Sequence, residues 1–142
     1  MPLQLDKSKI ISPLLTWYDA NKANLPWRGA DAYGVWLSEI MLQQTQIDTV
    51  LPYYERFLTQ YPTIHDLAHT DLDSILKLWE GLGYYSRARN LFKTARIVSG
   101  EFQGNFPDNV AGLLGLPGIC CFFSRVRRPP RFTLFPYTTH FR

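Results

Sequence analysis

Apolar side chains recur every three or four residues along most of this chain, and almost no stretch alternates as a half-exposed strand would. The clearest helical pattern has its inward positions at Ile47, Val50, Leu51, Tyr54, Leu58 and Tyr61. Pro52 falls inside this pattern and is expected to kink the helix. A later helix is predicted to turn Ala88, Leu91, Phe92, Ala95 and Val98 inward and to gather Arg89, Lys93 and Arg96 on another face.

Capping and breaking residues bound the other predicted helices. Ser12-Pro13 indicates a helix start or an early kink, followed by a buried stripe of Leu14, Leu15, Trp17 and Tyr18. Asp31 is expected to cap the helix that follows it. Thr70 and Asp73 resemble a capping box for a helix that ends at Gly81-Leu82-Gly83. With a short helix over about 109–114, the pattern predicts an all-α domain with short loops.

Composition narrows the class of protein. The chain has 142 residues and 46% hydrophobic content, enough for one core. The net charge of +3 suggests an acidic partner, but residues 1–119 hold all 12 acidic and 10 of the 15 basic residues and so carry a charge of −2. The positive charge comes from the five arginines of residues 120–142. No apolar run approaches the roughly 20 residues that span a membrane, and no signal peptide is evident. We therefore expect no membrane partner and a soluble, intracellular protein of the cytoplasm.

One acid stands out within the apolar segment WLSEIMLQQTQ, which runs from Trp36 to Gln46. The helical neighbours of this acid, Glu39, are Val35, Trp36, Leu42 and Gln43. Desolvation by such neighbours disfavours the charged carboxylate and is expected to raise its pKa toward the range of a general acid. The alternative is that Glu39 simply points outward at the rim of a buried helix.

The last 23 residues, CCFFSRVRRPPRFTLFPYTTHFR, show neither helical nor strand periodicity. We divide the chain into residues 1–119, a helical domain, and residues 120–142, a tail that we expect to be disordered. The ending FTLFPYTTHFR resembles translated sequencing-adapter DNA, so we interpret the tail as a frameshift or assembly artefact. A basic arm that binds nucleic acid is the alternative.

Four segments carry a family resemblance: LPWR (25–28), WLSEIMLQQTQ (36–46), LWEGLGYYSRARNL (78–91) and LPGI (116–119). They resemble the N-terminal catalytic region of MutY-type adenine DNA glycosylases, in the helix-hairpin-helix superfamily of base-excision repair enzymes. The resemblance covers nearly all of residues 8–119 and implies a truncated all-α helix-hairpin-helix glycosylase fold, with a six-helix region and the start of the hairpin. Endonuclease III is similar too, but it has no acid at the position of Glu39 and differs at LQQTQ.

The resemblance implies an enzyme that extrudes adenine mispaired with guanine or 8-oxoguanine in double-stranded DNA and hydrolyses its N-glycosidic bond. Glu39 would protonate adenine at N7 as the catalytic acid. Gln44 and Tyr84 would enter the base stack. The other residues that it implies at the site are Gln43, Arg89, Pro117 and Gly118 on the DNA, and Leu25, Trp27 and Arg28 at the adenine pocket.

Each of these residues also has a structural interpretation. Tyr84-Tyr85 could pack in the core, Gln43-Gln44 could be polar residues ending a helix, and the Arg89 face could be solvated surface. His65 and His69 have a metal-binding spacing but lack a third ligand, so we expect surface residues and no metal. Cys120 stands where the hairpin's next glycine is expected, and its Cβ disfavours the left-handed turn of a phosphate site.

Several parts that the resemblance implies downstream are missing from these 142 residues. They are an aspartate that stabilises the oxocarbenium ion, four cysteines for a [4Fe–4S] cluster, and a domain that checks for 8-oxoguanine. Cys120 and Cys121 cannot replace the widely spaced cluster ligands. We therefore expect a monomer with negligible glycosylase activity. The alternatives are an inactive helical DNA-binding module and a fragment without a stable fold.

Overall fold

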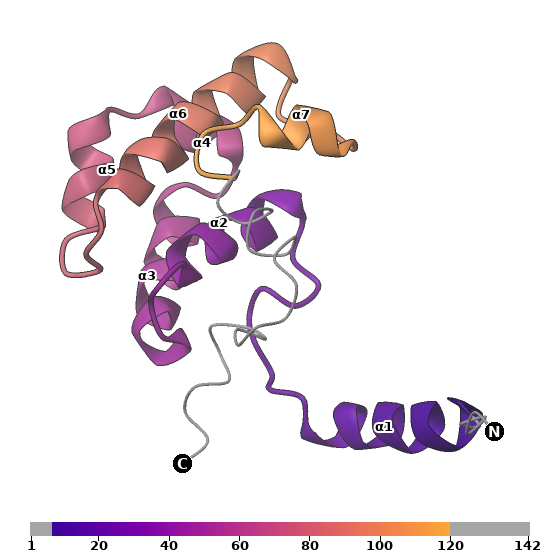
Figure 1. The fold of residues 1–142 in the computed structure, drawn as a ribbon. Helices are drawn as coiled ribbons and strands as arrows, with labels where there is room; N and C mark the ends of the chain where they lie inside the picture. The colour runs from indigo at the N-terminus through magenta and orange to yellow at the C-terminus, as the bar shows by residue number, and fades with distance from the viewer. Residues whose placement is uncertain (1–6, 120–142) are drawn as a thin grey trace.

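A computed structural model of the protein describes residues 7–119, and within that range it contains helices and turns but no strand (Figure 1). The elements are α1 (Lys7–Asn21), α2 (Ala32–Leu42), α3 (Ile47–Gln60), α4 (Ile64–His69), α5 (Leu72–Leu78), α6 (Ser86–Glu101) and α7 (Val110–Leu114). The all-α prediction is therefore confirmed for this part of the chain. The predicted tail, with Cys120 and Cys121, lies outside the described residues.

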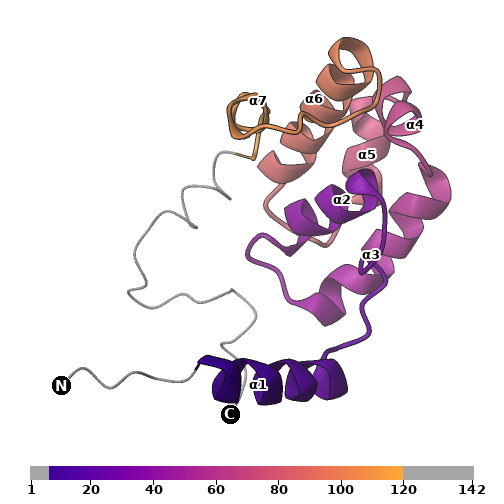
Figure 2. The same cartoon turned by 90° about the vertical axis from the view of Figure 1, so that its right-hand side faces the viewer.

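Helix α2 is the inner helix of the fold. It packs against α3 and α6, while α4 and α5 pack against α6 (Figures 1 and 2). Eight of its 11 residues are buried: Tyr33, Gly34, Trp36, Leu37, Ser38, Ile40, Met41 and Leu42. A helix that is apolar nearly all round is expected at such a central place. The acid at Glu39 is therefore an exception within a helix built for the core.

Aromatic rings fill the space between α3, α5 and the segment before α2. The ring of Phe57 on α3 meets that of Trp79 edge-on, with centroids 5.8 Å apart and planes at 90°. Trp27 meets Tyr54 in the same way at 5.2 Å and 78°. Such perpendicular pairs place the positive edge of one ring on the negative face of the other, which stabilises the pair beyond its burial.

The predicted helix boundaries are confirmed in part. Asp31 caps α2, because its Oδ1 accepts a 2.8 Å hydrogen bond from the Gly34 amide. The capping box predicted at Thr70 and Asp73 is wrong: Asp71 caps α5, and the capping box lies at Thr63 and Asp66 before α4. The sequence pattern did not predict α4, since six residues are too few to show a helical period.

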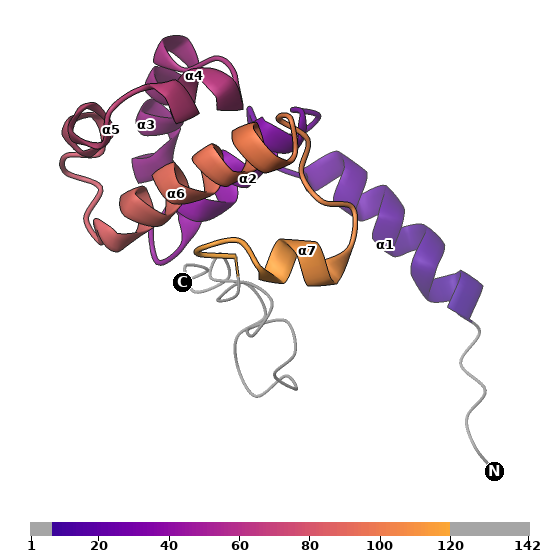
Figure 3. The same ribbon diagram turned by 90° about the horizontal axis from the view of Figure 1, so that it is seen from above.

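The prediction of a buried stripe on α1 is wrong. Leu14, Leu15, Trp17 and Tyr18 are all exposed, and Trp17 is the most exposed of them at 61%. The helix lies apart from the others, and no described element covers its apolar face (Figures 1 and 3). Nor does Ser12-Pro13 begin it: α1 starts at Lys7 and continues through Pro13.

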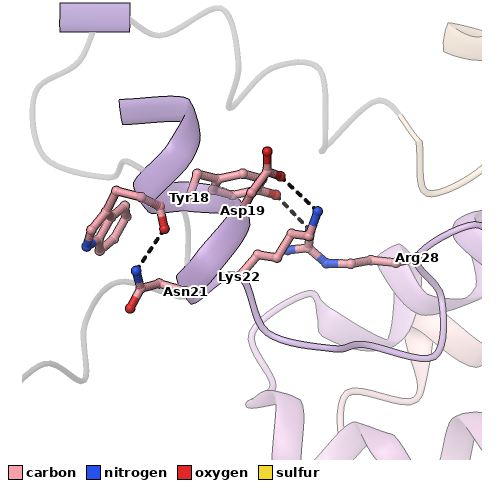
Figure 4. Close-up of polar contacts among 6 residues, drawn as sticks. Tyr18, Asp19, Asn21, Lys22 and Arg28 are labelled. Atoms are coloured by element: carbon pink, nitrogen blue, oxygen red, sulfur yellow. Dashed lines mark hydrogen bonds and ion pairs between the residues drawn. The ribbon is translucent and has the colours of Figure 1, made fainter. Parts of the chain in front are cut away.

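Polar contacts connect α1 to the segment before α2. The Nη1 atom of Arg28 donates a 2.7 Å hydrogen bond to the hydroxyl of Tyr18 (Figure 4). The guanidinium carbon of Arg28 also lies 5.6 Å from the centroid of the Tyr18 ring. All these groups are exposed, so the connection contributes little stability in water.

The remaining helices lie where the pattern predicts them, and the kink expected at Pro52 stays a prediction. Helix α3 runs from Ile47 through Pro52 to Gln60, α6 buries Ala88, Leu91, Ala95 and Val98, and α7 follows the capping residue Asn109. Phe92 is only half-buried. Within residues 7–119, no helix has the length and apolar character needed to cross a membrane.

Candidate active site

Glu39 is the only charged residue of α2, a helix whose side chains are mostly buried. Its neighbours in sequence, Ser38 and Ile40, are buried, and Glu39 itself is half-buried. This burial raises the pKa of its carboxyl above the ordinary value, in the direction that the sequence predicts. Within residues 7–119 the carboxyl makes no hydrogen bond or ion pair. It is thus both partly desolvated and free to exchange a proton with a bound group.

Helix α2 ends just after Glu39, at the two glutamines. Gln43 is the C-cap residue, and its Nε2 donates a 3.3 Å hydrogen bond to the carbonyl of Gly118. Gln44 is exposed and has a φ of 60°, in the left-handed region that residues with a Cβ rarely adopt. The two residues therefore differ: Gln43 joins α2 to the segment 116–119, whereas the Gln44 side chain is presented to solvent.

Tyr84 follows a turn in which Gly81 and Gly83 both have positive φ values, 93° and 72°. Tyr84 itself has a φ of 47°, and its side chain is 62% exposed. Tyr85 is exposed as well, so the core-packing interpretation of this pair is wrong. Left-handed residues other than glycine cluster at functional sites, where the surrounding structure holds them in place.

One buried residue that the sequence pattern did not single out lies between the turn at Gln44 and the turn at Tyr84. Arg87, in the first turn of α6, is only 6% exposed and donates hydrogen bonds to carbonyls of both turns. The spacing of the sequence indicates this burial, because residue 87 shares one helical face with the apolar residues 91, 95 and 98.

The residues predicted to wall an adenine pocket do not share one environment. Trp27 is buried against Tyr54, Leu25 is half-buried against the core, and Arg28 is exposed and bonded to Tyr18. Trp27 thus belongs to the hydrophobic core. Two hollows on the described surface lie elsewhere, one along α1 and the other between Asp31, Thr63 and Gly104.

The start of the predicted hairpin is fixed on α6. The carbonyl of Pro117 accepts a 2.9 Å hydrogen bond from the Thr94 hydroxyl. Gly118 has a φ of 83°, and a Cβ placed on it would lie 3.1 Å from Cβ of Asn90. The positive φ favours glycine here, and Asn90 would have to shift by a few tenths of an ångström to admit a Cβ. Cys120, on which the phosphate-binding turn depends, lies outside the described residues.

The predicted basic face of α6 and the two histidines lie on the surface. Arg89, Lys93 and Arg96 are exposed on α6, as their spacing predicts. His65 shares a 2.7 Å hydrogen bond with Ser99, and Nδ1 of His69 lies 2.6 Å from the His65 carbonyl oxygen. Across the described range, no three potential metal ligands come together. A [4Fe–4S] cluster needs four thiolates and does not fit residues 7–119, which contain no cysteine.

Comparison with known proteins identifies similar sequences. Residues 37–134 match a family described as the HhH-GPD superfamily base excision DNA repair protein. The chain is 51% identical over 108 residues to the adenine DNA glycosylase of Buchnera aphidicola subsp. Baizongia pistaciae (strain Bp), and 47% identical over 116 residues to that of Rattus norvegicus. Each match covers 75% of this chain but only 31% and 22% of the relatives, so the chain spans less than a third of their length.

Solved structures share the fold. A thermostable thymine-DNA glycosylase superposes with a TM-score of 0.70 at 30% identity, over 78% of this chain and 52% of that one. Endonuclease III in a non-covalent DNA complex gives 0.63 at 22% identity, over 80% and 54%. These two structures confirm the predicted all-α glycosylase fold.

Proposed function

We propose that this chain, which belongs to the HhH-GPD superfamily of base excision DNA repair proteins, carries the acid and the DNA-inserting side chains of an adenine DNA glycosylase. Its partner in this proposal is double-stranded DNA that contains an A:G or A:8-oxoguanine mispair, bound by one copy of the chain. The observation that carries the proposal is the half-buried, unpaired carboxyl of Glu39, held in an otherwise apolar helix five residues before the left-handed Gln44.

The chemistry of the reaction explains the need for such an acid. Anionic adenine is a poor leaving group, so a proton must reach the ring before or while the bond breaks. We propose that Glu39 protonates N7. A carboxyl with a raised pKa holds its proton closer to neutral pH and transfers it as the N-glycosidic bond breaks. The leaving electron pair then rests on a neutral base, and the sugar becomes an oxocarbenium-like ion that water attacks.

The target bond is inaccessible inside a stacked duplex, so the adenine must first leave the stack. Extrusion costs a few kcal/mol per unstacked step, which inserted side chains offset in part. We assign this insertion to Gln44 and Tyr84, the exposed side chains of the two left-handed turns. Arg89 and the segment at Pro117 and Gly118 are assigned to the flanking phosphates.

The proposed reaction also uses a second carboxylate, which stabilises the oxocarbenium-like ion, and within residues 7–119 no other acidic side chain affects the pKa of Glu39. Loss of one preorganised electrostatic partner typically slows an enzyme by about 10²–10³-fold. We therefore propose that these 142 residues distinguish a mispair from matched DNA but release adenine negligibly.

The test combines two measurements on the 142-residue chain. Fluorescence anisotropy compares binding to A:8-oxoguanine, A:G and A:T duplexes, and a single-turnover assay measures adenine release. We expect tighter binding to both mispairs than to A:T, with no adenine release above background. Equal binding to all three duplexes contradicts mispair recognition, and robust adenine release contradicts the assignment of the missing carboxylate.

A T:G duplex belongs in the same assay. The structural likeness to a thymine-DNA glycosylase makes thymine in DNA the competing substrate, and a T:G mispair presents that base opposite guanine. Preference for T:G over A:G would favour that substrate over adenine. We expect the reverse, because the identity to adenine DNA glycosylases is higher.

A further inference from the structure

The guanidinium of Arg87 connects the two turns that carry Gln44 and Tyr84. Its Nη1 donates hydrogen bonds to the carbonyls of Gln43 at 2.7 Å and Met41 at 2.6 Å. Its Nη2 donates to the carbonyls of Gly83 at 3.0 Å and Leu82 at 3.1 Å. One planar group thus spans the end of α2 and the glycine turn before α6.

The carbonyls at Gln43 and Gly83 have a particular place in the chain. Each belongs to the peptide group directly before a left-handed residue, Gln44 with φ 60° and Tyr84 with φ 47°. The orientation of that peptide group depends on the φ of the residue that follows it. A hydrogen bond to the carbonyl therefore opposes relaxation of φ to the negative values that residues with a Cβ prefer.

The surroundings of Arg87 fit a structural role for its charge. Among residues 7–119 no carboxylate pairs with it, and burial lowers the pKa of its guanidinium. The carbonyls at the end of α2 supply compensating negative potential, as helix C-termini do. The guanidinium carbon also lies 5.2 Å from the ring of Trp79 and 5.6 Å from that of Tyr84. Arg87 therefore contacts both the backbone before Tyr84 and its exposed ring.

We propose that Arg87 is a positioning residue that fixes Gln44 and Tyr84 relative to each other, and so sets the spacing at which the two side chains enter DNA. The inference rests on the proposed function, because it assumes that these side chains insert. Lysine cannot replace arginine in this role, since its donors radiate from a single nitrogen and cannot reach both turns as a planar fork does.

The first test is a thermodynamic cycle in the 142-residue chain, with binding to the A:8-oxoguanine duplex measured by anisotropy. Arg87→Lys keeps the charge and is expected to weaken binding on the order of tenfold. In the background of Gln44→Ala with Tyr84→Ala, the same change is expected to alter binding less than about twofold, because nothing remains to be positioned. Lys77→Met, which removes an exposed positive charge from α5, serves as the control and is expected to stay within about twofold of wild type.

A second measurement, made without DNA, distinguishes failure of the positioning role of Arg87 from failure of the insertion proposed for Gln44 and Tyr84. Backbone amide order parameters from NMR are expected to fall at Gln44 and Tyr84 in Arg87→Lys, from about 0.85 toward 0.6, and to stay unchanged in α3. Unchanged order at both residues overturns the positioning role whatever the DNA result. An equal loss of binding in both backgrounds also overturns it, because Arg87 would then act through overall stability or charge. If Gln44→Ala with Tyr84→Ala binds the mispair as wild type does, the insertion proposed above fails, and with it the role of Arg87 in DNA binding.

Discussion

The hydroxyl of Thr94, fully buried on α6, donates a 2.9 Å hydrogen bond to the carbonyl of Pro117. This bond holds the segment that follows α7 against the centre of α6. Thr94→Val keeps the shape and leaves the Pro117 carbonyl without its donor, which is expected to cost about 1–3 kcal/mol of unfolding free energy. Urea unfolding followed by circular dichroism measures the change. Thr59→Val is the matched control, because its hydroxyl bonds within the exposed face of α3. Equal losses in the two variants would contradict the structural importance of the Pro117 contact.

Glu39 is expected to make the folded protein less stable at neutral pH than a neutral residue would. Burial raises its pKa in the folded state, so the folded state holds the proton more tightly than the unfolded state does. The unfolding free energy therefore falls as pH rises from the ordinary value, near 4.3, through the raised one. Glu39→Gln removes this penalty.

The measurement compares wild type and Glu39→Gln by urea unfolding at several pH values. We expect the variant to be the more stable at about pH 8, with the difference vanishing below about pH 3, where both states of the wild type are protonated. Glu55→Gln, at an exposed position of α3, is the control. A constant difference across this range would mean that the Glu39 carboxyl is not desolvated.

Gly118 and Gly100 form a matched pair for backbone effects. At Gly118 the φ of 83° and the nearby Asn90 oppose a side chain, so Gly118→Ala is expected to destabilise the fold by at least about 1 kcal/mol. Gly100 lies in α6 with no atom within 4 Å of an added Cβ, so Gly100→Ala is expected to stabilise by about 0.5–1 kcal/mol. Thermal melts of both variants check the opposite signs.

Two substitutions of Gln44 separate the effect of its left-handed backbone on stability from the effect of its side chain on DNA binding. At φ 60°, Gln44→Gly is expected to be more stable than Gln44→Ala by about 1 kcal/mol. Both variants lose the amide, so both are expected to weaken mispair binding equally. The same pair of substitutions at Gln103, where φ is 52°, is expected to repeat the stability order without changing DNA affinity. Reduced affinity in the Gln103 variants would show that lost stability, and not loss of the Gln44 amide, weakens binding.

The isolated position of α1 predicts weak effects from its apolar residues. Trp17→Ser is expected to change the unfolding free energy by less than about 0.5 kcal/mol, because its side chain is exposed. Leu91→Ala, in the buried face of α6, is expected to cost about 2–5 kcal/mol. A large loss from Trp17→Ser in urea unfolding would mean that α1 packs on the core after all.

The sequence predicted the helices whose apolar period is long, such as α3 and α6, because three or more turns make one face evident. It did not predict α4, which is too short, and it misassigned the cap of α5 by one residue. It also placed the apolar residues of α1 inside, since periodicity shows that a helix has an apolar face but not whether a partner covers it. Among the site residues, it predicted the direction of the Glu39 pKa shift, which burial of the carboxyl causes.

The sequence by itself thus determined the helical class, the inner character of α2 and the direction of the Glu39 pKa shift, because the apolar pattern around these residues is local. Only the tertiary structure decided how the end of α2 meets the turn before α6. The hydrogen bonds from Arg87 to the carbonyls of Gln43 and Gly83 join segments about 40 residues apart, and any carbonyl can accept such a bond whatever its side chain. The side-chain pattern therefore carries no information about which carbonyls accept these bonds, and only the tertiary fold determines them.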